Sequence, residues 1–339
     1  MNTNELYLEN GFLNARWVNE LPYPFVFCLG GRGTGKTYGS LDDAVTNHEG
    51  HFQLMRRTQT ELDNISSDVN SPFKVLNTDK GYGITVKPHK NFAGIYGKTG
   101  QMIGQMVALS TVSNIRGFDA SEIELTIYDE FIPEAHKAPI KNEHLAFLNY
   151  YETVNRNREL LGRPPLKIRA YSNANDIMNP LIVGLGLVTK LDKMRAKKDQ
   201  IYIDRERGYV LIDLQSSPIS KKKKETALYK FAGDGEFSNM AINNEFNSPL
   251  SIPVARPLKE YNPIIHVGEL GIYKHKSNNK FYISSKKSGS PPVFTMKDTD
   301  LKRLRLTYYW MPEKYFLKKI EFESAICEIL FLRYWKIII

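Results

Sequence analysis

The stretch Gly30-Gly31-Arg32-Gly33-Thr34-Gly35-Lys36-Thr37 decides the fold of this 339-residue chain. It matches the pattern G-x-x-x-x-G-K-[ST], follows an apolar run at residues 24–29 and opens a helix-like segment, which is the context that a phosphate-binding loop requires. Glycines let such a loop curl until its N–H groups point at phosphates. We therefore expect all eight residues to bind a nucleoside triphosphate, with Lys36 on its β and γ phosphates and the Thr37 hydroxyl on Mg²⁺.

A pair of acids at the end of a later apolar run narrows the chemistry. Residues 124–130 are Glu-Leu-Thr-Ile-Tyr-Asp-Glu, so Asp129 and Glu130 are expected at the carboxyl edge of a strand, where open α/β sheets bind ligands. Asp129 would hold Mg²⁺ with its water shell, and Glu130 would orient or deprotonate the water that attacks the γ phosphate. Asn173 follows the next predicted strand and would sense that phosphate or water, or else only caps a helix.

The alternation of apolar runs with turns and helix-like stretches predicts the fold class. The predicted strands are residues 24–29, 52–55, 125–128 and 168–171. Residues 142–161 carry apolar side chains at helical spacing, so a helix should lead into the last of these strands. We predict an α/β fold with a mostly parallel sheet and flanking helices, of the P-loop class with an additional strand and a catalytic glutamate (ASCE).

Changes of composition along the chain predict three parts. Residues 1–195 form the expected ATPase domain, and residues 196–247, which are charged and turn-like, form the expected linker. Residues 248–339 should be a small α+β domain, and from Asn247 onward 16 Lys and Arg face 8 Asp and Glu, nearly the whole net charge of +9. The four lysines at 221–224 are either a DNA-binding strip or a soluble loop.

Bulk properties restrict the class of protein. With 42% apolar residues the chain can bury one large core and a smaller one, and its positive charge favours an acidic partner such as nucleic acid. Cys28 and Cys327 lie in no CxxC or Cys/His cluster, so we expect neither a disulfide framework nor a zinc site, as suits a reducing cytoplasm. The polar start predicts no secretory signal, and the apolar residues 325–339 are expected to be a packed helix or strand because they are too short for a membrane anchor.

Arginines near the predicted strands suggest a site shared between subunits, because charge on a transferred phosphoryl group is often neutralised by an arginine from a neighbour. The candidates are Arg32, Arg56, Arg57, Arg116, Arg156 and Arg158. We assign Arg57 to the nucleotide. Any of them could instead be an ordinary surface arginine.

Several stretches together resemble the DNA-packaging motor ATPases of small tailed phages of the phi-29 type, in order and spacing over residues 20–250. The matching stretches are residues 30–37, 56–57 with 61–62, 127–131, 153–159, 172–174 and 243–246. Among these, the sequence Arg-Asn-Arg-Glu at residues 156–159 is far more specific than the phosphate loop.

The resemblance implies a ring, pentameric in this family, that hydrolyses ATP with Mg²⁺ at subunit boundaries. The ring would pump double-stranded DNA through a portal into a prohead, with scaffold RNA as a further partner. Glu130 would be catalytic, with Arg156 and its neighbour Arg158 acting on an adjacent subunit's site. Arg116 would supply a second charge in trans, where the phi-29 type protein carries lysine. The protein would work in the host cytoplasm, transiently at the portal vertex, without a membrane.

The resemblance also implies that residues 248–339 form a domain like a ribonuclease H-like nuclease that has lost its acidic site. The only aspartates after Asn247 are Asp298 and Asp300, which we expect in a loop, and the predicted strand at residues 264–268 carries no acid. Because two-metal cleavage needs several convergent carboxylates, we predict no nuclease activity. The basic domain would instead bind DNA, the portal or a scaffold RNA, unless it is merely a solvated surface.

Three other functions remain open from the residues alone. They are a P-loop kinase, another DNA translocase or helicase-like motor, and a nucleotide-gated structural subunit without catalysis. The acid pair at residues 129–130 argues against the kinase, because it is suited to activating water.

Overall fold

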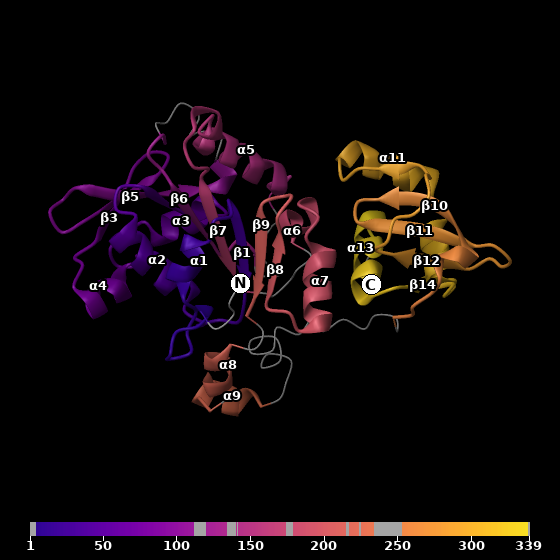
Figure 1. Cartoon of the computed structure of the whole chain (residues 1–339), viewed down its shortest axis with the longest axis horizontal. Helices are drawn as coiled ribbons and strands as arrows, with labels where there is room; N and C mark the ends of the chain where they lie inside the picture. The colour runs from indigo at the N-terminus through magenta and orange to yellow at the C-terminus, as the bar shows by residue number, and fades with distance from the viewer. Residues whose placement is uncertain are drawn as a thin grey trace. The chain divides into compact units, whose positions relative to one another are not determined.

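The computed structural model describes residues 5–111, 120–133, 140, 142–173, 179–214, 217–223, 225–233 and 253–337. Figure 1 shows the chain and its elements. The chain divides into two compact units, which we call the N-terminal unit and the C-terminal unit. The N-terminal unit consists of Met1–Leu181 and Met194–Phe246, and the C-terminal unit of Ile182–Lys193 and Asn247–Ile339.

Within the described part of the N-terminal unit, nine strands form one sheet (Figure 1). Their order across the sheet is β3 (Thr85–Pro88), β4 (Ala93–Tyr96), β5 (Met102–Ala108), β2 (Phe52–Arg56), β6 (Leu125–Asp129), β7 (Lys167–Ser172), β1 (Phe25–Leu29), β9 (Tyr209–Asp213) and β8 (Ile201–Asp204). All neighbours from β5 to β9 pair in parallel, whereas β3 with β4, β4 with β5 and β8 with β9 pair antiparallel. The carboxyl ends of the six parallel strands therefore share one edge.

The four predicted strands are confirmed as β1, β2, β6 and β7, which are neighbours in the centre of the sheet. Every residue of β2 and of β6 is buried. A parallel strand that is covered on both faces is mostly apolar rather than alternating, and β1, whose sequence is Phe-Val-Phe-Cys-Leu, shows this as a continuous apolar run. The predicted α/β class with a mostly parallel sheet is confirmed.

The predicted linker differs from the structure. Residues 201–213 lie in the sheet as β8 and β9, and β9 pairs with β1 from Phe25 opposite Tyr209 to Leu29 opposite Asp213. All five residues of β9 are buried, but a charged turn precedes it and conceals the apolar run in the sequence. The sheet of the ATPase domain therefore extends well beyond residue 195.

Helices connect the strands and continue after the sheet. They are α1 (Ala15–Glu20), α2 (Lys36–Asn47), α3 (Gln59–Ile65), α4 (Lys74–Lys80), α5 (Glu143–Asn155), α6 (Pro180–Gly184), α7 (Val188–Lys197), α8 (Pro218–Lys223) and α9 (Ala227–Ala232). The helix predicted at 142–161 is α5 followed by a short 3₁₀ turn, Glu159–Leu161, because Arg156, with φ 48° and ψ −132°, leaves the helical conformation and ends α5. A capping box of Thr58 and Glu61 begins α3.

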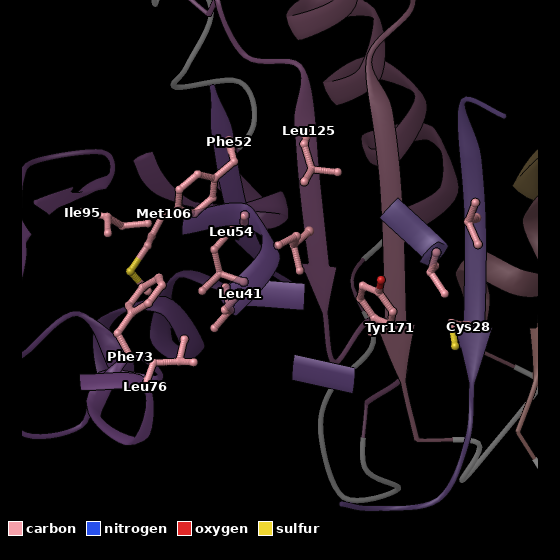
Figure 2. Close-up of a cluster of buried hydrophobic side chains, with 14 of the residues drawn as sticks. Cys28, Leu41, Phe52, Leu54, Phe73, Leu76, Ile95, Met106, Leu125 and Tyr171 are labelled. Carbon is pink, nitrogen blue, oxygen red and sulfur yellow. The ribbon is translucent and has the colours of Figure 1, made fainter. Parts of the chain in front are cut away.

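The core of the N-terminal unit joins the sheet to α2, α3 and α4, and Figure 2 shows part of it. Phe52, Leu54 and Met106 come from neighbouring strands, and Leu41 and Phe73 pack against the same cluster. Burying one such side chain contributes about 1.5–3 kcal/mol. This packing holds the strands rigidly, so their carboxyl ends can position functional groups.

The C-terminal unit has its own sheet. In order across it, the strands are β13 (Val293–Phe294), β10 (Tyr261–Val267), β11 (Leu270–His275), β12 (Phe281–Ser284) and β14 (Ile320–Phe322). A 3₁₀ turn (Leu258–Glu260) precedes the sheet, and its helices include α11 (Asp298–Thr307), α12 (Met311–Phe316) and α13 (Ala325–Trp335). Residues 325–335 of the predicted packed segment thus form the helix α13, whose N-terminus is capped by the Ser324 side chain.

The two aspartates of this unit do not lie in a loop, as the sequence predicted. Asp298 and Asp300 occupy the first turn of α11, where acidic side chains are favoured by the helix dipole. Asp300 accepts hydrogen bonds from the amide and hydroxyl of Thr295. Within the described residues, no three His, Cys, Asp or Glu side chains are grouped so that they could hold a metal ion, and no helix is long and apolar enough to cross a membrane.

Candidate nucleotide-binding site

The loop between β1 and α2 borders an open cavity of about 400 Å³. Gly33 and Gly35 have φ values of 61° and 88°, in the left-handed region that glycine adopts without strain. The residues that line the cavity are Arg32, Gly33, Thr34, Gly35, Lys36, Thr37, Tyr38, Asp129, Glu130, Ser172 and Asn173. Nine of the predicted site residues therefore line one cavity, while Gly30 and Gly31 lie at the start of the loop.

The Lys36 ammonium lies inside the curl of the loop. Its Nζ donates hydrogen bonds to the carbonyl oxygens of Gly30 and Gly31, at 3.1 and 2.7 Å, and to Thr34 Oγ1 at 3.2 Å. Burial lowers the pKa of Lys36 to about 8. A buried cation held mainly by carbonyl dipoles favours an anionic ligand, so the surroundings of Lys36 suit a phosphate.

The two residues predicted to hold a metal ion, Thr37 and Asp129, lie next to each other. Thr37 Oγ1 donates to Asp129 Oδ1 at 2.9 Å, although the two residues come from α2 and the end of β6. Asp129 Oδ2 is buried and, among the described residues, accepts no hydrogen bond of good geometry. Two adjacent oxygen donors, a hydroxyl and a carboxylate, are suited to Mg²⁺, which binds through few protein oxygens together with phosphates and water.

Glu130 lines the cavity from a left-handed backbone position, with φ 55°. Its half-exposed carboxylate forms an ion pair with Arg56, from the end of β2, and Arg56 Nη2 also lies 3.0 Å from Asp129 Oδ2. From the sequence, Arg56 was a candidate only for an arginine that acts on the site of a neighbouring subunit. Its position at the carboxyl end of a strand was the signal for a role beside the acid pair.

Asn173 directly follows β7 and lies at the same edge of the sheet as the acid pair. Its side-chain Oδ1 accepts a hydrogen bond from Lys36 Nζ at 3.3 Å. The preceding Ser172 hydroxyl accepts from the Ile132 amide at 3.1 Å, which ties the end of β7 to the chain that follows Glu130. The structure thus brings Asn173 to the phosphate loop, as predicted.

Arg57 is not placed to bind the nucleotide, so this prediction is corrected. Its side chain is 0% exposed and does not line the cavity. It forms a two-point ion pair with the equally buried Glu143, from Arg57 Nε and Nη2, at 2.8 and 3.2 Å. Arg56 is the last residue of β2 and Arg57 follows it. Their side chains have different partners, because Arg56 pairs with Asp129 and Glu130 whereas Arg57 pairs with Glu143, so only Arg56 faces the site.

Arg156 and Arg158 follow α5 and lie near the amino ends of the parallel strands, whereas the cavity lies at their carboxyl ends. Arg158 is buried and donates to the carbonyl oxygen of Ser121, which precedes β6, so its predicted catalytic role is corrected to a structural one. Arg156 is exposed to solvent. Neither can reach the cavity of its own subunit. Arg116 and residues 243–246 lie outside the described residues.

The phosphate loop, the Thr37–Asp129 pair and the strand order define a P-loop nucleotide-binding protein with an α/β fold. The family model described as Podovirus DNA encapsidation protein (Gp16) matches residues 14–335, nearly the whole chain. The chain therefore belongs to the Podovirus DNA encapsidation protein family.

Two solved structures of packaging motors are similar to the chain. The bacteriophage Phi-29 viral genome packaging motor assembly is 19% identical, with a TM-score of 0.62, over 96% of this chain and 98% of that chain. The Phi-28 gp11 DNA packaging motor is also 19% identical, with a TM-score of 0.61, over 98% of this chain and 99% of that chain. At this identity the likeness is one of fold. No curated protein matches the sequence.

Proposed function

We propose that the chain hydrolyses ATP and uses the free energy to move double-stranded DNA into a phage prohead. The observation that carries the proposal is that Lys36, Asp129 and Glu130, from α2 and the end of β6, line one cavity. Membership of the DNA encapsidation family supports DNA as the cargo.

Each side chain has a distinct task in this proposal. Lys36 would exchange loop carbonyls for the β and γ phosphate oxygens, and Thr37 with Asp129 would hold Mg²⁺, which neutralises phosphate charge when bound. Glu130 would orient the attacking water and accept its proton after its carboxylate turns away from Arg56. Asn173, hydrogen-bonded to Lys36, would orient the γ phosphate or that water.

The strand order supports assignment to the class with an additional strand and a catalytic glutamate. Strand β7 lies between β1, which leads into the phosphate loop, and β6, which ends in the acid pair. This arrangement separates Glu130 from the loop by the width of one strand and leaves room for a water beside the γ phosphate. Hydrolysis is therefore better supported than transfer to an acceptor.

A ring of subunits would complete the site. Arg156 is exposed at the edge of the sheet opposite its own cavity, so its guanidinium suits contact with another subunit's nucleotide. The family resemblance suggests five subunits docked on a portal, with Arg116 as a second charge in trans and scaffold RNA as a further contact.

The C-terminal unit would bind nucleic acid or the portal rather than cut DNA. Its five-stranded sheet suits a degenerate ribonuclease H-like domain, and β10 carries no acidic residue. The unit also holds nearly all of the excess positive charge. Contacts should go mainly to phosphates, because a packaging motor must accept any DNA sequence.

The function is tested with the full chain, proheads and linear double-stranded DNA. The expected result is phosphate release that DNA and proheads stimulate, together with DNA that becomes protected from added nuclease. Equal ATP turnover by wild type and Glu130→Gln protein would contradict hydrolysis at this site. Separation of strands, or phosphoryl transfer to an acceptor, would favour the helicase-like or kinase functions.

A further inference from the structure

One lysine of the run at residues 221–224 lies against the phosphate loop. Lys223 is the last residue of α8, and its half-buried Nζ donates a hydrogen bond to the carbonyl oxygen of Arg32. Arg32 and Gly33 both line the cavity. Lys223 thus differs from the exposed Lys222 beside it and does not belong to a solvated strip.

The lysine occupies room that a glycine provides. A Cβ atom added to Gly33 would lie 2.5 Å from Lys223 Nζ, closer than real Cβ contacts, and 3.1 Å from its Cε, so the end of the lysine would have to move aside. Gly33 also has a positive φ, which any other residue would adopt with strain. The curl of the backbone therefore requires this glycine, and the Lys223 ammonium lies directly against it.

Helix α8 is anchored to the strand that precedes the loop, so the position of Lys223 is defined. Leu214 donates its amide to the Leu29 carbonyl at 2.8 Å, and the Ser217 amide donates to the Leu214 carbonyl at 3.2 Å. The buried hydroxyls of Ser217 and Ser220 are hydrogen-bonded at 2.7 Å. This chain of contacts runs from the end of β1 to the first turn of α8.

The charges around the loop call for an anion with several negative charges. Lys36, Lys223 and the N-terminus of α2 bring positive charge to one short loop, and the positive charge of Lys223 contributes to the lowered pKa of Lys36, after burial. The two acids that line the cavity, Asp129 and Glu130, are both ion-paired with Arg56. A triphosphate would relieve the repulsion between the two ammonium groups.

We propose that Lys223 is a second phosphate-binding lysine of the nucleotide site, which exchanges the Arg32 carbonyl for an oxygen of the terminal phosphates. The inference rests on the proposed binding of ATP and extends it to a residue of α8, supplied by the same subunit. A charge-assisted hydrogen bond to phosphate increases affinity by about tenfold or more. Lys223 should therefore distinguish ATP and ADP from AMP.

The test measures binding of MgATP, MgADP and AMP to the full chain by calorimetry. Lys223→Met, which keeps the apolar stem, should weaken ATP and ADP binding about tenfold or more and leave AMP binding unchanged, while Lys223→Arg retains most of the affinity. Lys230→Ala, an exposed lysine on α9, is the matched control and should bind as wild type does. Lys223→Gln repeats the measurement with a polar side chain if the Met variant folds poorly.

The outcomes separate this inference from the proposed function. If wild type binds ATP, Lys36→Ala does not, and Lys223→Met binds within twofold of wild type, the role of Lys223 is overturned while the site stands. Equal losses for AMP and ATP, or tighter ATP binding, would also overturn it, because the lysine would then only support or obstruct the loop. If wild type itself binds no ATP, the proposed function fails.

Discussion

The Arg56 guanidinium is ion-paired with Glu130, with Arg56 Nη1 2.5 Å from Glu130 Oε2. The same guanidinium contacts Asp129, the last residue of β6, so the Arg56 side chain pairs with both Asp129 and Glu130. The ion pair holds the Glu130 carboxylate against Arg56 rather than toward a water molecule in the cavity. If Glu130 activates the attacking water as proposed, we expect this contact to loosen during hydrolysis.

Glu130→Gln should keep nucleotide binding and lose turnover. The amide has the shape of the carboxylate but accepts no proton, so the rate should fall by about 100-fold or more. Phosphate release in the steady state and equilibrium binding of ATP measure the two effects separately. A turnover near that of wild type would show that another residue activates the water.

Arg156→Ala should abolish hydrolysis only where subunits assemble. Its side chain is remote from its own cavity, so nucleotide binding by the variant should remain normal. Mixing Arg156→Ala with Lys36→Ala protein should restore part of the activity at hybrid boundaries, as measured by phosphate release over a series of ratios. Arg163→Ala, another arginine at the same edge, is the control, and a lack of rescue at every ratio would argue against action in trans.

Arg57→Ala should impair folding rather than binding. It would leave Glu143 buried without its cation, which costs about 3–5 kcal/mol in free energy of unfolding. The double variant Arg57→Met/Glu143→Leu should recover most of this loss, because it removes both charges and keeps the volume. Urea unfolding of the three proteins checks the prediction, and a loss below about 1 kcal/mol in the single variant would refute the structural role.

Glu323→Gln should destabilise the C-terminal unit near neutral pH. Partial burial alone would raise the pKa of the Glu323 carboxyl, but hydrogen bonds from Ser285 and Ser284 outweigh it and hold the pKa below its ordinary value. The carboxylate therefore adds stability above the ordinary pKa, and this contribution is lost as pH falls through the lowered one. The variant should be about 1–2 kcal/mol less stable at pH 7 and approach wild type in acid, and a difference independent of pH would exclude the charge as the cause.

DNA binding should weaken steeply with salt. If the basic C-terminal unit contacts phosphates, the logarithm of affinity should fall linearly with the logarithm of salt concentration, with a slope of about 0.9 for each phosphate. Lys274→Ala and Lys286→Ala, two exposed lysines of this unit, should each lower the slope if they contact the backbone. Fluorescence anisotropy at several salt concentrations measures the slope, and a flat response would exclude phosphate contacts.

The central strands and the phosphate loop could be predicted from the sequence because their signals are local. Glycine spacing encodes the curl of the loop, and burial leaves a continuous apolar run in β1. Strand β9 was missed because its five buried residues follow a charged hairpin turn, and its place beside β1 depends on a long-range pairing that no local pattern records.

Side-chain direction limited the site prediction. Asp129 and Glu130 were found because the end of a strand implies the edge of the sheet. The choice between Arg56, the last residue of β2, and Arg57, which follows it, depends on the direction of each side chain at the end of the strand, and two adjacent arginines give no local signal of that direction. Lys223 could not be separated from its neighbouring lysines, since only the anchoring of α8 directs it to the loop.

Strand β1 has a parallel neighbour on each side along its whole length, β7 on one and β9 on the other. β1 is therefore unable to slide easily along its neighbours, because such a movement would break the backbone hydrogen bonds on both of its sides at once. We therefore expect any movement that accompanies nucleotide binding or hydrolysis to occur in segments outside β1, such as α8, rather than as a slide of this strand.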